Sequence, residues 1–366
     1  MTDLDLLYSD VEDDLRATVR QLLADRCDPA AVAAAYDGDR SLGAGLWEAL
    51  ATDLGVAGLL VPEEHGGAGA STREAAVVLE ELGASVAPVP FLTSAVVATT
   101  VLLESGTDLL GDLAAGRRSA ALAVPLSTAP DAVLPTIGRG PDDRFSGTVT
   151  SVAGALEADV LLVPLAVPDG VELYAMPSAD VQVAPVVSLD MTRPLADVTL
   201  DGASGELVLP AAAGEPAVRR ALEVGAALLA SEQLGVARWC LESTVAHLKE
   251  RRQFGRVVGG FQALKHRLAD LFVAVESSAA AARAATAAVA ADAPDRGIAT
   301  AVAQAHCSDV AVRAAEECVQ LHGGIGMTWE HPAHLYLKRA KADQIAFGTP
   351  GAHRRRLAEL VDLPPA

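Results

Sequence analysis

The segment KERRQFGRVVGGFQ, residues 249–262, joins two long helical patterns in the chain. Before it, residues 216–250 carry apolar side chains at helical spacing, which predicts one long helix. Basic residues crowd the last turn of that helix, and Gly255, Gly259 and Gly260 then interrupt the pattern. On charge alone, these basic residues would serve only to complement the negative, C-terminal end of the helix dipole. The segment therefore predicts a connection between two helices through a basic, glycine-rich turn.

The chain after Pro210 predicts a bundle of helices. Apolar side chains recur at helical spacing in four segments, at about 216–252, 260–291, 296–321 and 333–360. A four-helix bundle buries four such apolar stripes against one another.

A second glycine turn follows the third of these segments, in CVQLHGGIGM, residues 318–327. Glycine after a helix commonly serves only to end it. Gly323 and Gly324 also let backbone amides approach a ligand closely, and Gln320 could hydrogen-bond an adenine or a ribose. The two glycine turns of the bundle are therefore candidate binding elements.

The rest of the chain predicts two further domains. Ser9 and Glu12 have the spacing of a capping box, and helical patterns follow there and again at 41–54 and 71–82. In the middle of the chain, short β-branched runs alternate with Pro, Gly and Asp, which predicts a small β-barrel or sandwich. The order helical, β, helical favours separate domains over an alternating βαβ sheet. The expected fold is α+β and multidomain, with an N-terminal helical domain at 1–118, a middle small β-barrel or sandwich at 119–209 and a C-terminal four-helix bundle at 210–366.

Composition excludes several classes of function. The net charge is −20, which opposes binding to nucleic acid or to an anionic membrane surface. The four cysteines lack CxxC spacing, and Cys318 with His322 has no second ligand pair, so we expect no disulfide and no metal site. The first residues, 1–5, lack a basic region followed by an apolar stretch. We therefore expect no signal peptide and a cytoplasmic protein.

Three motifs together resemble the acyl-CoA dehydrogenase family: RRQFG at 251–255, FQ at 261–262 and QLHGGIG at 320–326. VPEEHGGAG at 61–69 looks like the family's N-terminal helical domain, so the resemblance covers nearly the whole chain. It implies an FAD held between subunits, with the isoalloxazine on the β-domain of one subunit. The glycine turns of the other subunit bind the pyrophosphate and adenosine of this FAD. The resemblance assigns this binding role to Arg251, Gln253, Phe254, Gln320, Gly323 and Gly324.

The chain departs from the family pattern where the general base should be. Active members use a carboxylate to remove the α-proton of an acyl-CoA while the β-hydrogen leaves as hydride to the flavin. Most carry that glutamate in Tyr-Glu-Gly-Thr, but this chain has AFGT at 346–349, and Phe347 cannot accept a proton. Other members place the base on the preceding long helix, where this chain has Gly225. Glu223 lies two residues away and should face elsewhere on the helix.

The expected flavin bed is altered as well. Members of the family carry Thr-Glu-Pro-Gly-x-Gly-Ser-Asp in the first part of the β-domain, where this chain has PLSTAPD at 125–131. A later Trp-Ile-Thr is replaced by SVA at 151–153. The chain therefore lacks the family's residues for the part of the site that it would form itself, around the base and the flavin ring. It retains the family's residues in the two turns that would bind the FAD of a neighbouring subunit.

This asymmetry resembles the shorter, base-lacking subunit of heteromeric family members. It implies an α2β2 complex in which a homologous base-bearing subunit acts on an acyl-CoA, for example in fatty acid or steroid side-chain β-oxidation. The family also implies an electron-transferring flavoprotein as the acceptor. Two alternatives stay open: a self-sufficient flavoenzyme whose base is relocated to Glu223 or Glu232, and a dehydrogenase-like scaffold that binds no flavin.

Overall fold

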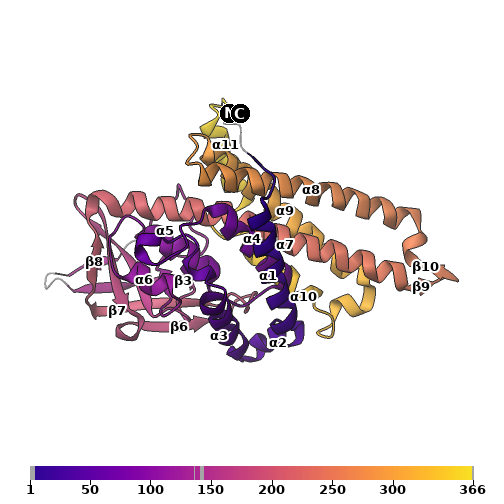
Figure 1. Ribbon diagram of the computed structural model, residues 1–366, viewed down its shortest axis with the longest axis horizontal. Coiled ribbons are helices and arrows are strands. Elements are labelled where there is room, and N and C mark those ends of the chain that lie inside the picture. Colours follow the sequence, from indigo (N-terminus) through magenta and orange to yellow (C-terminus); the bar gives the residue numbers. More distant parts are fainter. Residues whose placement is uncertain (1–4, 136, 141–143, 365–366) are drawn as a thin grey trace.

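The computed structural model describes residues 5–135, 137–140 and 144–364. Residues 1–4, which carry most of the expectation about a signal peptide, lie outside this range. Figure 1 shows a β region at one end of the molecule and a helical bundle at the other, with the N-terminal helices packed beside both. One long helix runs from the β region into the bundle and connects the two ends.

The N-terminal part is helical, and both of its longer helices begin at a capping box. Ser9 caps the first with Glu12 at the third position, and Ser71 caps the fourth with Glu74. The predicted helix at 41–54 is α-helical in its first part and a π-helix in its second. The elements are α1 (Asp10–Arg26), α2 (Pro29–Ala33), η1 (Ala34–Asp37), α3 (Ser41–Glu48), η2 (Ala49–Asp53), η3 (Val56–Gly58), η4 (Glu63–His65), α4 (Thr72–Ser85), η5 (Phe91–Ala98), α5 (Thr99–Leu102) and α6 (Leu109–Ala114).

The middle part is a sandwich of two four-stranded sheets, with strand orders β1-β4-β5-β8 and β2-β3-β7-β6. Pairing is antiparallel except between β1 and β4. The inward side chains of the two sheets form a separate apolar core around Phe145, Leu161 and Val198. The strands are β1 (Ala120–Leu122), β2 (Gly138–Arg139), β3 (Phe145–Ala153), β4 (Val160–Val167), β5 (Gly170–Pro177), β6 (Gln182–Val186), β7 (Leu195–Ala203) and β8 (Glu206–Leu209), with η6 (Ser178–Asp180) between β5 and β6.

The C-terminal part is the expected bundle, with one correction. The predicted fourth helix at 333–360 is two helices, because the chain breaks at 344–349. Phe347 and Gly348 have positive φ there, and Thr349 then caps a new helix that has Pro350 in its first turn. The elements are α7 (Ala211–Glu250), β9 (Arg252–Gln253), β10 (Arg256–Val257), η7 (Val258–Gly260), α8 (Gln262–Ala290), α9 (Arg296–His322), η8 (Gly323–Met327), α10 (Ala333–Asp343) and α11 (Pro350–Leu360).

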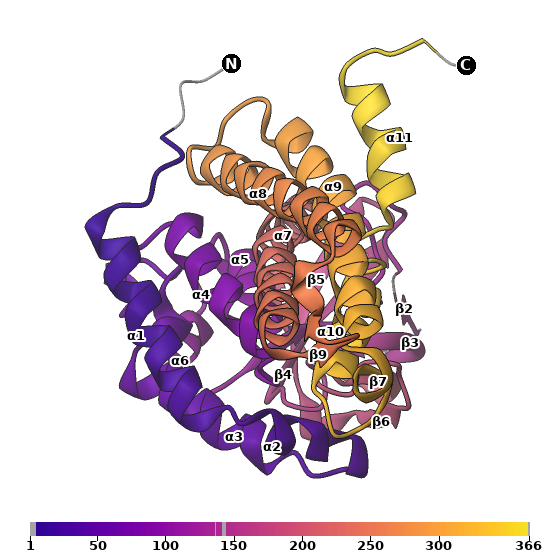
Figure 2. The same cartoon turned by 90° about the vertical axis from the view of Figure 1, so that its right-hand side faces the viewer.

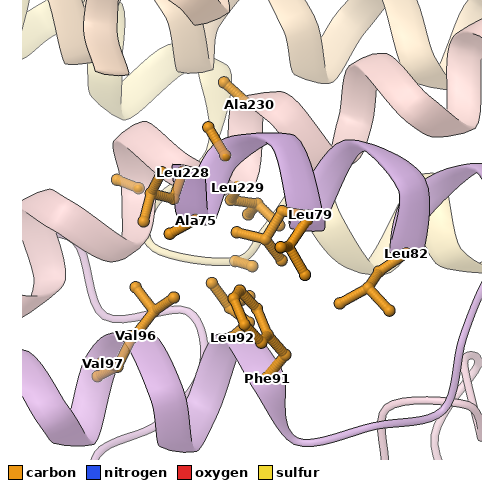
Figure 3. Packing of buried hydrophobic residues seen from close by; sticks show 14 of the residues in the cluster. Ala75, Leu79, Leu82, Phe91, Leu92, Val96, Val97, Leu228, Leu229 and Ala230 are labelled. Atoms are coloured by element: carbon orange, nitrogen blue, oxygen red, sulfur yellow. The ribbon is translucent and has the colours of Figure 1, made fainter. Parts of the chain in front are cut away.

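The 40-residue helix α7 organises the molecule. It packs against α4 so closely that a Cβ added at Gly235 would lie 1.9 Å from the carbonyl oxygen of Glu80. Figure 3 shows Leu228 and Leu229 of α7 meeting Leu79 of α4 and Phe91 of η5 in one apolar cluster. The α+β architecture with helical, β and helical parts is therefore confirmed. The domain limits 1–118, 119–209 and 210–366 stay a prediction.

Candidate functional site

The segments that depart from the family pattern meet around one side chain, that of Phe347. Its backbone N–H donates to the carbonyl of Leu126, 2.8 Å away, in the altered 125–131 loop. The N–H of Leu126 in turn donates to the carbonyl of Ser151 at 3.0 Å, at the start of the altered SVA segment. The departures that the sequence shows separately are therefore a single local feature of the structure.

The phenyl ring of Phe347 fills the space above Gly225. A Cβ added at Gly225 would lie 3.0 Å from Cζ of that ring and 2.9 Å from Cγ2 of Val97. Residues 225 and 347, where the resemblance leads us to expect a base, therefore share one space, and a ring without a polar atom occupies it. His353 of α11 holds the backbone of Phe347 in place, since its Nε2 donates to the carbonyl of Phe347 at 3.0 Å. Burial lowers the pKa of His353, so this imidazole is neutral.

The cavity left beside Phe347 measures only about 20 Å³. That volume holds roughly one water molecule and is far below the ~300 Å³ of a small-molecule site. Apart from the hydroxyl of Thr93, the side chains of its walls are apolar: Thr93, Val97, Leu122, Val124, Pro125, Leu126, Ala153, Leu222 and Phe347. Neither a flavin ring nor an acyl chain fits without rearrangement, and the described walls offer no carboxylate.

Glu232, one candidate for a relocated base, is locked in a buried network of ion pairs. Arg193 Nη2 lies 2.5 Å from its Oε2, and Arg339 Nη1 lies 2.5 Å from its Oε1. Asp343 and Asp190 bind the same two guanidinium groups. Burial alone would raise the pKa of Glu232, but the two arginines outweigh it and hold the pKa below its ordinary value. A carboxylate held in this way is a structural anion and a poor proton acceptor.

Glu223, the other candidate, lies in a separate hollow of about 480 Å³ between α7, α9 and α11. It forms ion pairs with Arg220 at 3.4 Å and with Arg296 at 3.2 Å. Arg219 and Arg356 also line this hollow, but Phe347 and Gly225 do not. Glu223 therefore lines a different hollow from the space that Phe347 and Gly225 share, where we expect a base.

The predicted cofactor residues lie at the far end of the bundle, in two turns that face outward (Figures 1 and 2). In the hairpin of β9 and β10, Phe254 and Gly255 form the tip with φ of +51° and +74°. The side chain of Phe254 is 89% exposed. Arg251, which directly precedes the hairpin, is exposed and forms no ion pair with the described residues. Gln253 is exposed as well.

The second turn is η8, which follows α9. Gly323 has a φ of +67°, and a Cβ added at Gly323 or Gly324 would meet no atom within 4 Å. Their backbone faces open space, as a turn that accepts a ligand requires, and the side chain of Gln320 is exposed beside it. Two carboxamides, a cation and open glycine backbone suit the phosphates and adenosine of a dinucleotide. This half of the site therefore fits FAD, whereas the half around Phe347 does not.

Sequence reasoning missed that histidine rings from the helices that lead into the two turns lie in contact. The ring of His322, at the end of α9, lies 4.4 Å from the ring of His247 on α7 and 4.1 Å from that of His331. The histidines are 75 and 9 residues apart along the chain, so no spacing rule could have grouped them. Within the described ranges, no group of three or more His, Cys, Asp or Glu side chains has a metal-binding arrangement. None of the helices described is both long and apolar enough to cross a membrane.

A helical domain, a β-sandwich and a bundle with two outward glycine turns define a class of flavoprotein dehydrogenases, and comparison with known proteins agrees. Residues 9–110 match the acyl-CoA dehydrogenase N-terminal domain, and residues 212–361 match the acyl-CoA dehydrogenase C-terminal domain. The acyl-CoA dehydrogenase IpdE2 of Mycolicibacterium smegmatis is 35% identical over 343 residues, which cover 94% of this chain and 96% of that protein. The chain therefore belongs to the acyl-CoA dehydrogenase family, a family of FAD-dependent oxidoreductases.

Two solved structures extend the comparison to complexes. The structure of the ChsE4–ChsE5 complex from Mycobacterium tuberculosis has a TM-score of 0.87 with 26% identity, covering 99% of this chain and 100% of that chain. A variant of the Tcur3481–Tcur3483 steroid ACAD has a TM-score of 0.84 with 30% identity, covering 96% of this chain and 98% of that chain.

Proposed function

We propose that this chain is the non-catalytic subunit of a heteromeric acyl-CoA dehydrogenase and completes the FAD site of a base-bearing partner. The observation that carries the proposal is the contrast between the two halves of the site. The ring of Phe347 fills the position of the base and leaves about 20 Å³ beside it. The two turns at the far end of the bundle are meanwhile exposed and open.

In this proposal the chain binds and orients the cofactor but moves no proton. FAD, when bound, supplies the hydride acceptor for α,β-desaturation of an acyl-CoA thioester. Arg251 provides positive charge for the pyrophosphate, since the described residues leave its guanidinium without an ionic partner. Gln253 and Gln320 hydrogen-bond the adenosine, and the open backbone of Gly323 and Gly324 lets the cofactor approach closely.

Exposed apolar side chains around the turns support a partner at this end of the bundle. Phe254 at the hairpin tip is 89% exposed, Met327 is 82% exposed and Trp329 is 66% exposed. Large exposed apolar side chains on protruding turns are typical of interaction sites. Phe272 and Val273 on α8 are also exposed, which suits a second contact in an α2β2 assembly.

The relatives suggest the composition and the substrate class of that assembly. One similar structure is of a complex of ChsE4 with ChsE5, and another is of a steroid ACAD. By analogy, we propose a homologous base-bearing dehydrogenase as the partner and an acyl-CoA with a bulky, steroid-derived acyl group as the substrate. An electron-transferring flavoprotein is the proposed acceptor.

The test is to purify the chain alone and with a base-bearing homologue, and to measure bound FAD and acyl-CoA oxidation in each sample. The proposal expects no stoichiometric FAD and no activity for the chain alone, and one FAD for each pair of subunits in an active complex. A yellow, active homo-oligomer would support the self-sufficient enzyme instead. A stable complex without flavin would support the scaffold.

A further inference from the structure

A cavity of about 350 Å³ lies between the N-terminal helices and the β-sandwich. Its walls come from α2, η1 and α3, from the two prolines before η5, and from the loops that lead into β4 and β7. The volume falls within the range of small-molecule sites, which begins near ~300 Å³. The cavity shares no residue with the two glycine turns or with the space around Phe347.

Most side chains that line this cavity are apolar. Leu42 and Trp47 come from α3, Leu156 from the loop between β3 and β4, and Met191 from the loop between β6 and β7. Trp47 is partly buried, and its indole N–H forms no hydrogen bond within the described ranges. An occupant therefore needs an apolar body to displace water from these walls.

Arg40, which directly precedes α3, brings a cation to the cavity. Its side chain is partly buried, and its guanidinium forms no hydrogen bond or ion pair with the described residues. A guanidinium presents its donors in a planar fork that matches the two oxygens of a carboxylate. The polar group of the occupant is therefore an anion, and a carboxylate fits this single arginine.

Asp39 limits the charge that such an occupant can carry. It lines the cavity and is exposed, so it marks the open side. Its carboxylate accepts the backbone N–H of Ser41 at 2.9 Å, and hydrogen bonds from Ser41 lower the pKa of Asp39. This fixed negative charge repels a dianion, such as a phosphate monoester, more than it repels a single carboxylate.

Glu157 adds a carboxyl group whose hydrogen-bonding capacity is not used. Its Oε2 is buried and has no hydrogen-bond partner among the described residues. Buried polar atoms nearly always have a partner, so this one indicates that the cavity holds water or a ligand. Burial raises the pKa of Glu157 to about 7, and Arg40 opposes that shift. Below that pH the carboxyl is protonated and does not compete with an anion for Arg40.

We propose that this cavity binds a small apolar carboxylate, whose carboxylate group pairs with Arg40 and whose hydrocarbon body packs on Trp47 and Met191. The inference goes beyond the proposed function and does not rest on it, because the cavity lies outside the FAD site. The loop that carries Met191 also carries Arg193, which pairs with Glu232 of α7. The occupant would therefore join the N-terminal helices to a loop that is anchored in the bundle.

The test is calorimetric titration of the full chain, alone and in the heteromer, at pH 6. The probe is octanoate, and 1-octanol and octylamine are the neutral and cationic probes of equal chain length. Octanoate should bind about tenfold more tightly than octanol, the factor expected for one charge-assisted hydrogen bond, and octylamine should bind more weakly than either. Octanoate should also raise the melting temperature of the chain.

Two variants decide whether Arg40 recognises the carboxylate. Arg40→Gln should raise the Kd of octanoate about tenfold and leave the Kd of octanol unchanged, a selectivity that a general loss of structure would not produce. The matched control is Arg26→Gln, which removes a charge from the exposed end of α1, outside the cavity. It should bind both probes as the wild type does.

Tryptophan fluorescence tests the location. Octanoate should change the emission of the wild type but not that of Trp47→Phe, which keeps Trp239 and Trp329. Absence of octanoate binding, equal Kd values for octanoate and octanol, or an unchanged octanoate Kd in Arg40→Gln would each overturn the site. None of these results would alter the FAD content of the heteromer, so the proposed function stands or fails separately.

Discussion

Phe347→Glu restores the residue type that the family uses as a base and tests whether the surrounding space can host it. We expect the variant to be destabilised and inactive. The wild-type ring is 4% exposed and packs on Gly225, and removing a buried phenyl group costs about 4 kcal/mol of unfolding free energy. The matched uncharged variant Phe347→Gln loses the same ring.

The difference between the two variants reports the buried charge. A cavity of about 20 Å³ gives a carboxylate room for roughly one water molecule, and its described walls offer no cationic partner, so burial should raise the pKa of the introduced glutamate. A carboxyl group whose pKa is raised by folding does not destabilise the protein below the pKa that it has in the unfolded chain. Its cost in unfolding free energy appears as the pH rises from that value through the pKa of the folded state. If the pKa rises by ~1.5 units, Phe347→Glu should match Phe347→Gln near pH 4 and be about 2 kcal/mol less stable at pH 8.

Urea unfolding of the isolated chain at several pH values measures this difference, and flavin reduction by acyl-CoA is the companion assay. Equal unfolding midpoints for the two variants at pH 8 would mean that the space around residue 347 is polar and open. Recovery of flavin reduction by Phe347→Glu would show that the chain can host the chemistry itself. Either result would refute the reasoning from the filled cavity.

Three further variants test the other parts of the account. Arg251→Ala should weaken FAD binding by the heteromer about 30-fold in equilibrium dialysis, from the loss of one charge-assisted contact of about 2 kcal/mol, while urea unfolding should find the midpoint of the chain unchanged. Glu232→Gln should destabilise the chain by about 3 kcal/mol, because it leaves two buried guanidinium groups short of an anion. It should not alter the rate of flavin reduction in the folded heteromer. A selective loss of that rate would favour a base relocated to Glu232. Gly235→Ala should lower the free energy of unfolding by about 3 kcal/mol in thermal or urea unfolding, since the added Cβ would meet the Glu80 carbonyl oxygen at 1.9 Å. The control Gly45→Ala adds a Cβ with nothing within 4 Å and should be neutral or slightly stabilising.

Local signals in the sequence predict much of the fold. The capping boxes at Ser9 and Ser71 begin α1 and α4, and the glycine turn after residue 250 ends α7. The β-branched runs of the middle part predict most of its strands, but not β2 (Gly138–Arg139) or β8 (Glu206–Leu209), because each of these is too short to show alternation. The break at 344–349 was missed because the apolar pattern continues across it, although Gly348 and Pro350 mark the place.

The candidate site divides in the same way. The cofactor residues sit in contiguous motifs, so sequence alone could nominate Arg251 or Gly323, and their roles stay predictions. The contact of Phe347 with Gly225 joins residues 122 positions apart, and only the fold brings them together. Glu232 looked like a free carboxylate because Arg193 and Arg339 lie far from it in the chain. Long-range pairing of charges and rings carries no local signal.

The ratio of FAD to protein in purified samples tests the central claim most directly. Flavin absorbance after gel filtration, divided by the concentration of each subunit, gives this ratio for the chain alone and for its complex with a base-bearing homologue. The account predicts a ratio near zero for the chain alone and one FAD for each pair of unlike subunits in the complex. One FAD for every copy of this chain, bound without a partner, would contradict it.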